Sequence, residues 1–156
     1  MAAIGEPAHG RAMSEGGMTL RFVLAALAYI VPTFPLGYLW HLVVFQPYYD
    51  ALNVYRSDIV IPFGIVAMVI QGVVWAFVYS RLFAGERVLL GALKFACLAA
   101  PLASSFLVLA VAAKHHMASV SGFVAVETAF TVVQYAVVSP LIALAFSVGT
   151  ERRHGA

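Results

Sequence analysis

The sequence predicts an all-α, polytopic membrane protein with four transmembrane helices in an up-down bundle. The composition, four long apolar segments and the placement of the basic residues all indicate this fold class. Of the 156 residues, 63% are hydrophobic and only 10% are charged, whereas soluble domains typically carry about 25% charged residues. A water-soluble fold of this length has too little interior for that apolar surface, which a lipid bilayer would solvate.

Each of the four apolar segments is long enough to cross a membrane as a helix. A helix of roughly 20 residues spans a hydrocarbon core about 30 Å thick, and backbone groups in lipid must pair within their own segment. The alternating segments of about ten residues that form a transmembrane barrel do not occur. The expected spans cover about 21–45, 59–83, 88–113 and 123–149.

These spans predict one transmembrane domain over 19–150, between a flexible N-terminal tail at 1–18 and a C-terminal tail at 151–156. The connection at 84–87 is very short, which predicts an antiparallel hairpin of the second and third helices. The third helix carries small side chains at four-residue spacing, which allow close helix contact. We expect them to pack within the chain, with contact to a second copy or to other membrane subunits as the alternative. They are Ala92, Ala96, Ala100 and Ser104.

The basic residues predict that both termini are cytoplasmic, because cytoplasmic loops carry an excess of Lys and Arg. One side of the predicted topology has Arg11, Arg21, Arg81, Arg87, Lys94, Arg152 and Arg153. The other side has only Arg56 and Lys114, so the loops at about 46–58 and 114–122 should face outward from a bacterial cytoplasmic membrane. Aromatic residues gather at membrane interfaces, and we expect an outer belt of Tyr38, Trp40, Tyr48, Tyr49 and Tyr55.

Composition also excludes several functional classes. Cys97 is the single cysteine, which excludes an internal disulfide, a CxxC redox pair and a CxxCH haem attachment site. The net charge of +2 is too small to indicate nucleic-acid binding. No catalytic or nucleotide-binding motif is present, so an enzyme is the weakest functional class and we expect no cofactor.

Ionisable side chains gather near the predicted outer ends of the helices. His41 lies about one turn below the outer end of the first helix, and Glu127 lies one to two turns below the outer start of the fourth. An ionised carboxylate at the centre of a membrane helix costs roughly 2.5–3.5 kcal/mol. Glu127 should therefore face the bundle and be protonated, hydrated, or paired with His41 or Lys114. The same outer layer is expected to contain Asp50, Asp58, His115 and His116.

The outer layer allows three interpretations. The simplest is structural, with one salt bridge from Glu127 holding the bundle together. Because histidine changes charge near neutral pH, a His41–Glu127 pair could instead accept and release a proton. With His115 or His116 added, the same residues could bind a divalent metal, since imidazole and carboxylate groups are suitable ligands.

Neutral polar side chains are expected at the middle of the membrane. Gln71 lies at the centre of the second helix and Gln134 at the centre of the fourth. Interhelical hydrogen bonds of about 0.6 kcal/mol each are their expected role, and a polar path to Glu127 is the alternative. Hydroxyl groups at similar depth belong to Thr33, Ser104, Ser105 and Thr131. Prolines should shape the helices or mark a discontinuous helix at a binding site; they are Pro32, Pro35, Pro62, Pro101 and Pro140.

The stretch GYLWHLVVFQPYYDAL at 37–52, followed by an apolar span with a central glutamine, resembles small bacterial four-helix membrane proteins catalogued as domains of unknown function. Those families share a Trp near the end of the first helix, then an aromatic residue, then an aromatic or acidic residue that opens the first loop. The matching positions here are Trp40, Phe45, Tyr48, Tyr49 and Asp50. The resemblance covers the first half of the chain and implies a fold but no activity.

The sequence therefore favours a small multi-pass membrane protein with a structural or accessory role. The first alternative is a proton- or ion-coupled transporter or channel for small molecules that uses Glu127, with His41, Gln71 and Gln134 as further candidates. The second is a membrane metal-binding protein or enzyme that uses the outer histidine and glutamate residues.

Overall fold

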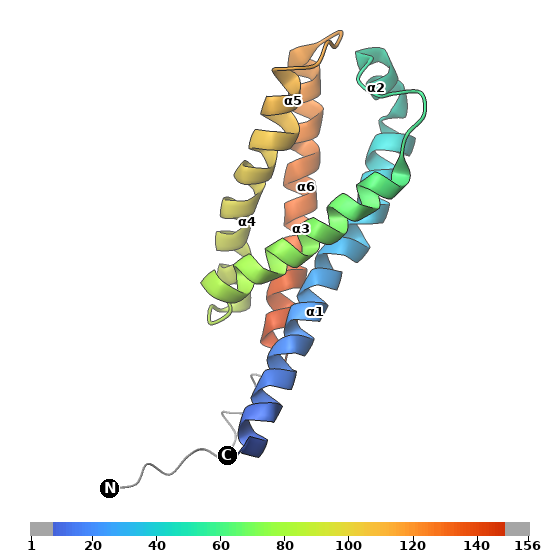
Figure 1. Ribbon diagram of the computed structural model, residues 1–156. Helices are drawn as coiled ribbons and strands as arrows, with labels where there is room; N and C mark the ends of the chain where they lie inside the picture. Colours follow the sequence, from blue (N-terminus) through green and yellow to red (C-terminus); the bar gives the residue numbers. More distant parts are fainter. Residues whose placement is uncertain (1–7, 149–156) are drawn as a thin grey trace, which may run out of the picture.

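A computed structural model describes residues 8–148 of the chain, and every regular element among them is helical (Figure 1). Four helical segments are long and apolar enough to cross a membrane, which confirms the predicted fold class. Successive segments run in opposite directions, as an up-down bundle requires. The candidate spans are Gly17–Val44, Ile61–Leu82, Val88–Ala112 and Val120–Ser147.

The first span consists of α1 (Ala8–Leu39) and a π-helical segment, η1 (Trp40–Val44). The helix α1 begins within the segment 1–18 that we expected to be a flexible tail, and the candidate span within it starts at Gly17. Residues 1–7 and the predicted C-terminal tail at 151–156 lie outside the described residues.

The second span is α3 (Ile61–Leu82), and the third is built from α4 (Val88–Ser104), a π-helical segment η2 (Ser105–Leu109) and α5 (Ala110–Ala112). The fourth span is α6 (Val120–Ser147). Pro62 lies in the first turn of α3, where its missing N–H has no helical partner to lose. The other span prolines lie inside α1, α4 and α6.

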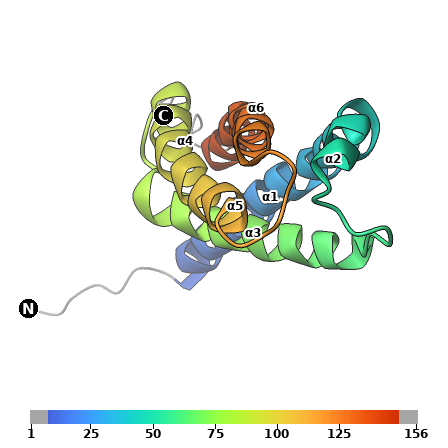
Figure 2. The same cartoon turned by 90° about the horizontal axis from the view of Figure 1, so that it is seen from above.

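The central helix of the bundle is α6. Half of the residues in the most apolar stretch of α6 are buried. In each of the other three spans, 17–22% of the residues in the corresponding stretch are buried. The helix α6 packs against α1 on one side and α4 on the other, and α3 lies across α1 (Figure 2). Small residues allow this close packing, and a methyl group added at Gly72 of α3 would lie 3.0 Å from the backbone oxygen of Ala26.

The short predicted turn joins α3 to α4. The two helices do not remain side by side beyond it. Aromatic contacts join them near the turn, where the ring centroids of Tyr79 and Phe95 are 5.6 Å apart. Further along, α3 crosses the bundle obliquely and leaves α4 to pack on α6 (Figure 1). The small-residue stripe of α4 lies at the core, since Ala92 is buried and Ala96 and Ala100 pack against the core cluster.

A short helix, α2 (Gln46–Leu52), follows η1 after the single residue Phe45. Pro47 in its first turn favours helix initiation, and Asn53 ends it in the left-handed conformation with φ of 55°, which asparagine tolerates. The buried face of α2 carries Tyr49 and Leu52, which pack against α6 and η2 in a second apolar cluster. We call this part of the bundle the α2 end.

Candidate functional site

The carboxylate of Glu127 and the imidazole of His41 meet inside the bundle at the α2 end. Glu127 Oε1 lies 3.3 Å from His41 Nε2, and the two side chains are 13% and 19% exposed. The residues are 86 positions apart in sequence, since 127 − 41 = 86, but η1 and α6 bring them to the same depth. Of the expected partners of Glu127, His41 is the one in contact.

The other imidazole nitrogen determines what the pair can do. His41 Nδ1 lies 2.9 Å from the backbone oxygen of Gly37, and a carbonyl oxygen can only accept a hydrogen bond. Nδ1 therefore carries a proton, so a neutral His41 presents the Nε2 lone pair to Glu127. Two acceptors then face each other until one further proton binds between them. One proton bound between Nε2 and Oε1 would convert this contact into a hydrogen bond.

Tyr49 completes the cluster from α2. Its hydroxyl group donates a hydrogen bond to the same Glu127 oxygen at 2.7 Å, and its side chain is fully buried. Burial raises the pKa of Tyr49 well above its ordinary value of 10, and the neighbouring Glu127 charge raises it further. Tyr49 therefore remains a neutral donor, and we call His41, Tyr49 and Glu127 the proton cluster.

Aromatic rings surround the proton cluster. The ring of Phe130 lies 4.4 Å from the imidazole of His41, and Tyr55 stacks on Tyr49 with centroids 4.8 Å apart. Burial also raises the pKa of Tyr55, with the Glu127 charge as the second cause. Tyr49 is buried among these side chains, so its ring does not face the membrane interface as a member of the predicted outer belt would. Tyr38 and Tyr48 of that belt are exposed.

The remaining outer-layer candidates lie away from the proton cluster. Asp50 is exposed, and Asp58 pairs with Arg56 on the surface at 2.9 Å. His115 and His116 are also exposed, and His115 Nδ1 lies 3.1 Å from the backbone oxygen of Val111 in α5. Within residues 8–148, no three His, Cys, Asp or Glu side chains form a group that could hold a metal. The four residues predicted as metal ligands are therefore separated, with only His41 and Glu127 together.

The mid-bundle glutamines form a second polar cluster with a residue that the sequence analysis did not single out. The hydroxyl group of Tyr29 donates to Gln71 Oε1 at 2.5 Å and accepts from Gln134 Nε2 at 3.1 Å. Gln134 Nε2 also lies 3.4 Å from the hydroxyl oxygen of Thr33. We call these four residues the amide cluster. Ser104 and Ser105 are not part of it, and the Ser105 hydroxyl bonds to the backbone of Leu102.

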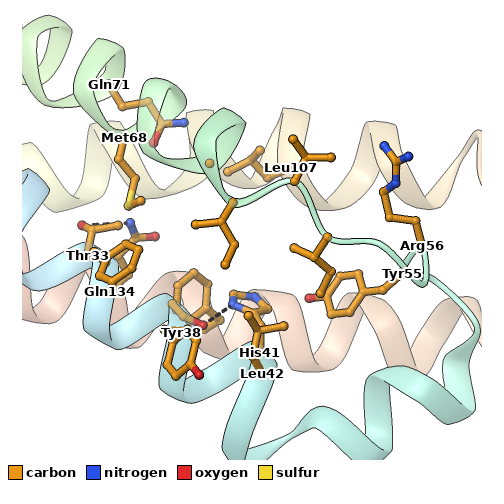
Figure 3. Close-up of a pocket in the computed structure, with 17 residues that line it drawn as sticks. Thr33, Tyr38, His41, Leu42, Tyr55, Arg56, Met68, Gln71, Leu107 and Gln134 are labelled. Atoms are coloured by element: carbon orange, nitrogen blue, oxygen red, sulfur yellow. Dashed lines mark hydrogen bonds between the residues drawn. The ribbon is translucent and has the colours of Figure 1, made fainter.

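Two cavities connect the two clusters. A cavity of about 470 Å³ extends from Arg56 and Tyr55, past His41, to Gln71 and Gln134 (Figure 3). A smaller one of about 300 Å³ reaches Glu127 and Thr131. Both are bordered by the same five residues: His41, Tyr55, Leu107, Phe130 and Gln134. A solute in the larger cavity would therefore touch the imidazole that faces Glu127.

Comparison with known proteins adds no family to this description. No protein-family model, curated protein or solved structure matches the chain. The resemblance of residues 37–52 to bacterial four-helix membrane proteins stays a prediction, and the functional argument depends on the geometry alone.

Proposed function

We propose that the protein is a proton-coupled membrane carrier for a small solute. In this proposal His41 and Glu127 bind the proton, and the larger cavity binds the solute. The observation that supports it most directly is the 3.3 Å contact between two groups that need one shared proton, at the wall of a cavity of about 470 Å³. Cavities of roughly 300–1,000 Å³ are typical of small-molecule sites.

The proton cluster is suited to reversible proton binding. With His41 neutral and Glu127 ionised the pair has a charge of −1, and one proton makes it neutral. An uncompensated charge is costly in the membrane, so proton binding changes the energy of this region strongly. Tyr49 donates to the carboxylate throughout, which keeps the ionised form accessible.

Coupling follows from the shared residue His41. A solute that contacts His41 alters the energy of its protonation, and protonation must then alter solute affinity by the same factor. The proton cluster also joins η1, α2 and α6, so a change in its charge acts on three elements, of which η1 and α6 border the cavities. Both π segments contribute, since His41 belongs to η1 and Leu107 to η2; such segments are frequent at functional sites.

We also propose the orientation that the basic residues predict, in a bacterial cytoplasmic membrane with both termini inside. In this orientation the α2 end faces outward. The proton cluster then lies on the side from which protons would enter the cell down an inward gradient. Arg81, Arg87 and Lys94 would face the cytoplasm.

The accessory role favoured by the sequence is the competing function. The same contacts tie α1, α2 and α6 together, which supports a purely structural use of Glu127. A structural pair would stabilise the protein without moving protons or solutes, so the two functions are separable by a flux measurement.

The test uses the full chain in liposomes that contain a pH-sensitive dye. A pH gradient is imposed, and accumulation of labelled aromatic amides, acids and amines is measured against protein-free liposomes. Glu127→Gln should abolish gradient-driven accumulation, whereas Glu86→Gln should not, because Glu86 pairs with Lys94 at the opposite end. The carrier function is refuted if accumulation is unchanged in Glu127→Gln, or if the folded wild type accumulates none of the solutes. The accessory role would then be the remaining function.

A further inference from the structure

The two amides of the amide cluster present one hydrogen-bond donor and one acceptor to the cavity. Tyr29 has a single hydroxyl proton, which it gives to Gln71 Oε1 while it accepts from Gln134 Nε2. The second N–H of Gln134 points to Thr33. Among the described residues, Gln71 Nε2 and Gln134 Oε1 therefore have no protein partner.

The same pattern results when both amide groups are turned over together. If both were turned over, Gln71 Nε2 would donate to Tyr29 and Tyr29 would donate to Gln134 Oε1. In both of these arrangements the hydroxyl group accepts from one amide and donates to the other. The cavity receives one N–H donor and one carbonyl acceptor in either arrangement.

The amide cluster has the burial expected of a built site. Gln134 is only 6% exposed as a residue, and it borders both cavities. Figure 3 shows Gln71, Thr33 and Gln134 at one end of the cavity, with Tyr55 and Arg56 at the other. Between these ends the wall is mostly apolar, with Phe34, Leu42, Met68 and Leu107 among its residues.

We infer that the solute of the proposed carrier is a small neutral amphiphile with an apolar body and a head group that both accepts and donates a hydrogen bond. A carboxamide or a protonated carboxyl group meets this requirement, with its carbonyl toward the donor amide and its N–H or O–H toward the acceptor amide. The inference deepens the proposed function and depends on the same cavity.

Charged head groups fit the amide cluster less well. A carboxylate has only acceptors and would place an oxygen against Gln134 Oε1 without a proton between them. An ammonium group has only donors and would meet the N–H groups of Gln71. Arg56 does not change this, because Asp58 pairs with its guanidinium group at the mouth of the cavity.

Binding to the full chain in lipid nanodiscs tests the head group separately from transport. The probes share one aromatic body: phenylacetamide, phenylacetic acid, phenethylamine and ethylbenzene, compared by saturation-transfer NMR and competition. Phenylacetamide should bind about tenfold more tightly than phenethylamine or ethylbenzene, as expected for about two hydrogen bonds. Phenylacetic acid should match it only below the carboxyl pKa of about 4.

Variants locate the binding. Gln134→Leu and Gln71→Leu should each remove the preference for the amide, whereas Gln46→Leu, at an exposed position of α2, should keep it. The probe series on the wild type remains decisive even if a variant fails to fold. Equal affinity for the four probes, or no binding of any, would overturn the inference. Amide-selective binding without Glu127-dependent accumulation would overturn the carrier function and leave this site intact.

Discussion

The substitution Tyr49→Phe tests the proton cluster with the smallest structural change. It removes one oxygen atom from a fully buried side chain and leaves the stacking of the ring on Tyr55. The lost contact is the 2.7 Å hydrogen bond to Glu127 Oε1, which connects α2 to α6. Since burial keeps Tyr49 neutral, the substitution changes no charge of its own near neutral pH.

The expected loss of stability depends on the protonation of the cluster. A hydrogen bond to a charged group contributes about 1.5–3 kcal/mol, and one between neutral groups about 0.5–1.5 kcal/mol. Tyr49→Phe should therefore lower the free energy of unfolding by about 2 kcal/mol when Glu127 is ionised and by about 1 kcal/mol when it is protonated.

Reversible unfolding in mixed micelles with a denaturing detergent, at pH values of about 4 and 8, measures the loss of stability at each pH. Tyr48→Phe is the matched control, because Tyr48 is the exposed neighbour on α2 and makes no side-chain hydrogen bond with a described residue. The reasoning is refuted if Tyr49→Phe is as stable as the wild type at the higher pH, or if its loss is the same at both.

Three further predictions concern the bundle around the site. Gly72→Ala should lower the free energy of unfolding by about 1–3 kcal/mol, because its methyl group would lie 2.7 Å from Ile30 Cγ1. Gly64→Ala in the same helix should not lower it, because that methyl group would meet nothing within 4 Å. Thermal unfolding of the two variants checks this prediction. Folding raises the pKa of Tyr55, so its contribution is complete below about pH 10 and is lost above it; Tyr55→Phe should flatten the fall in stability on the alkaline side, and an unchanged slope would contradict this. Lys94→Met breaks a partly exposed pair with Glu86 and should cost less than about 1 kcal/mol in the same thermal assay.

The sequence was sufficient to predict the four spans and the common depth of His41 and Glu127, because both follow from counting helical turns below a span end. It left His41 as one of two possible partners of Glu127. The facing stripes are also visible in the spacing: Tyr29 and Thr33 are four apart in the first span, and Glu127 and Thr131 are four apart in the fourth. Residues at such spacing share one helix face, so the position of Tyr29 beside the glutamines could have been inferred.

Other features depended on backbone geometry that the pattern does not encode. The sequence placed Tyr49 among the aromatic residues of the membrane interface, but α2 turns its buried face toward α6. Pro47 followed by Tyr49 and Leu52 at helical spacing was the pattern from which this short helix could have been predicted. His115 and His116 were expected near Glu127, yet the chain has already left α5 and they point to the surface. The oblique path of α3 also follows from packing on α1 rather than from the short turn.

The π segment η1 fixes the number of residues that can connect α1 to α2 in this bundle. A π turn accommodates an extra residue relative to an α-helix, and one residue corresponds to about 100° of rotation and 1.5 Å of rise. Deleting one residue from Trp40–Val44 would therefore turn α2 around the helix axis and carry Tyr49 away from Glu127, even with every named side chain retained. Substitutions of the exposed Val43 and Val44 in η1 should be tolerated where insertions and deletions are not. The spacing between Thr33 and Tyr49 is therefore itself a structural constraint.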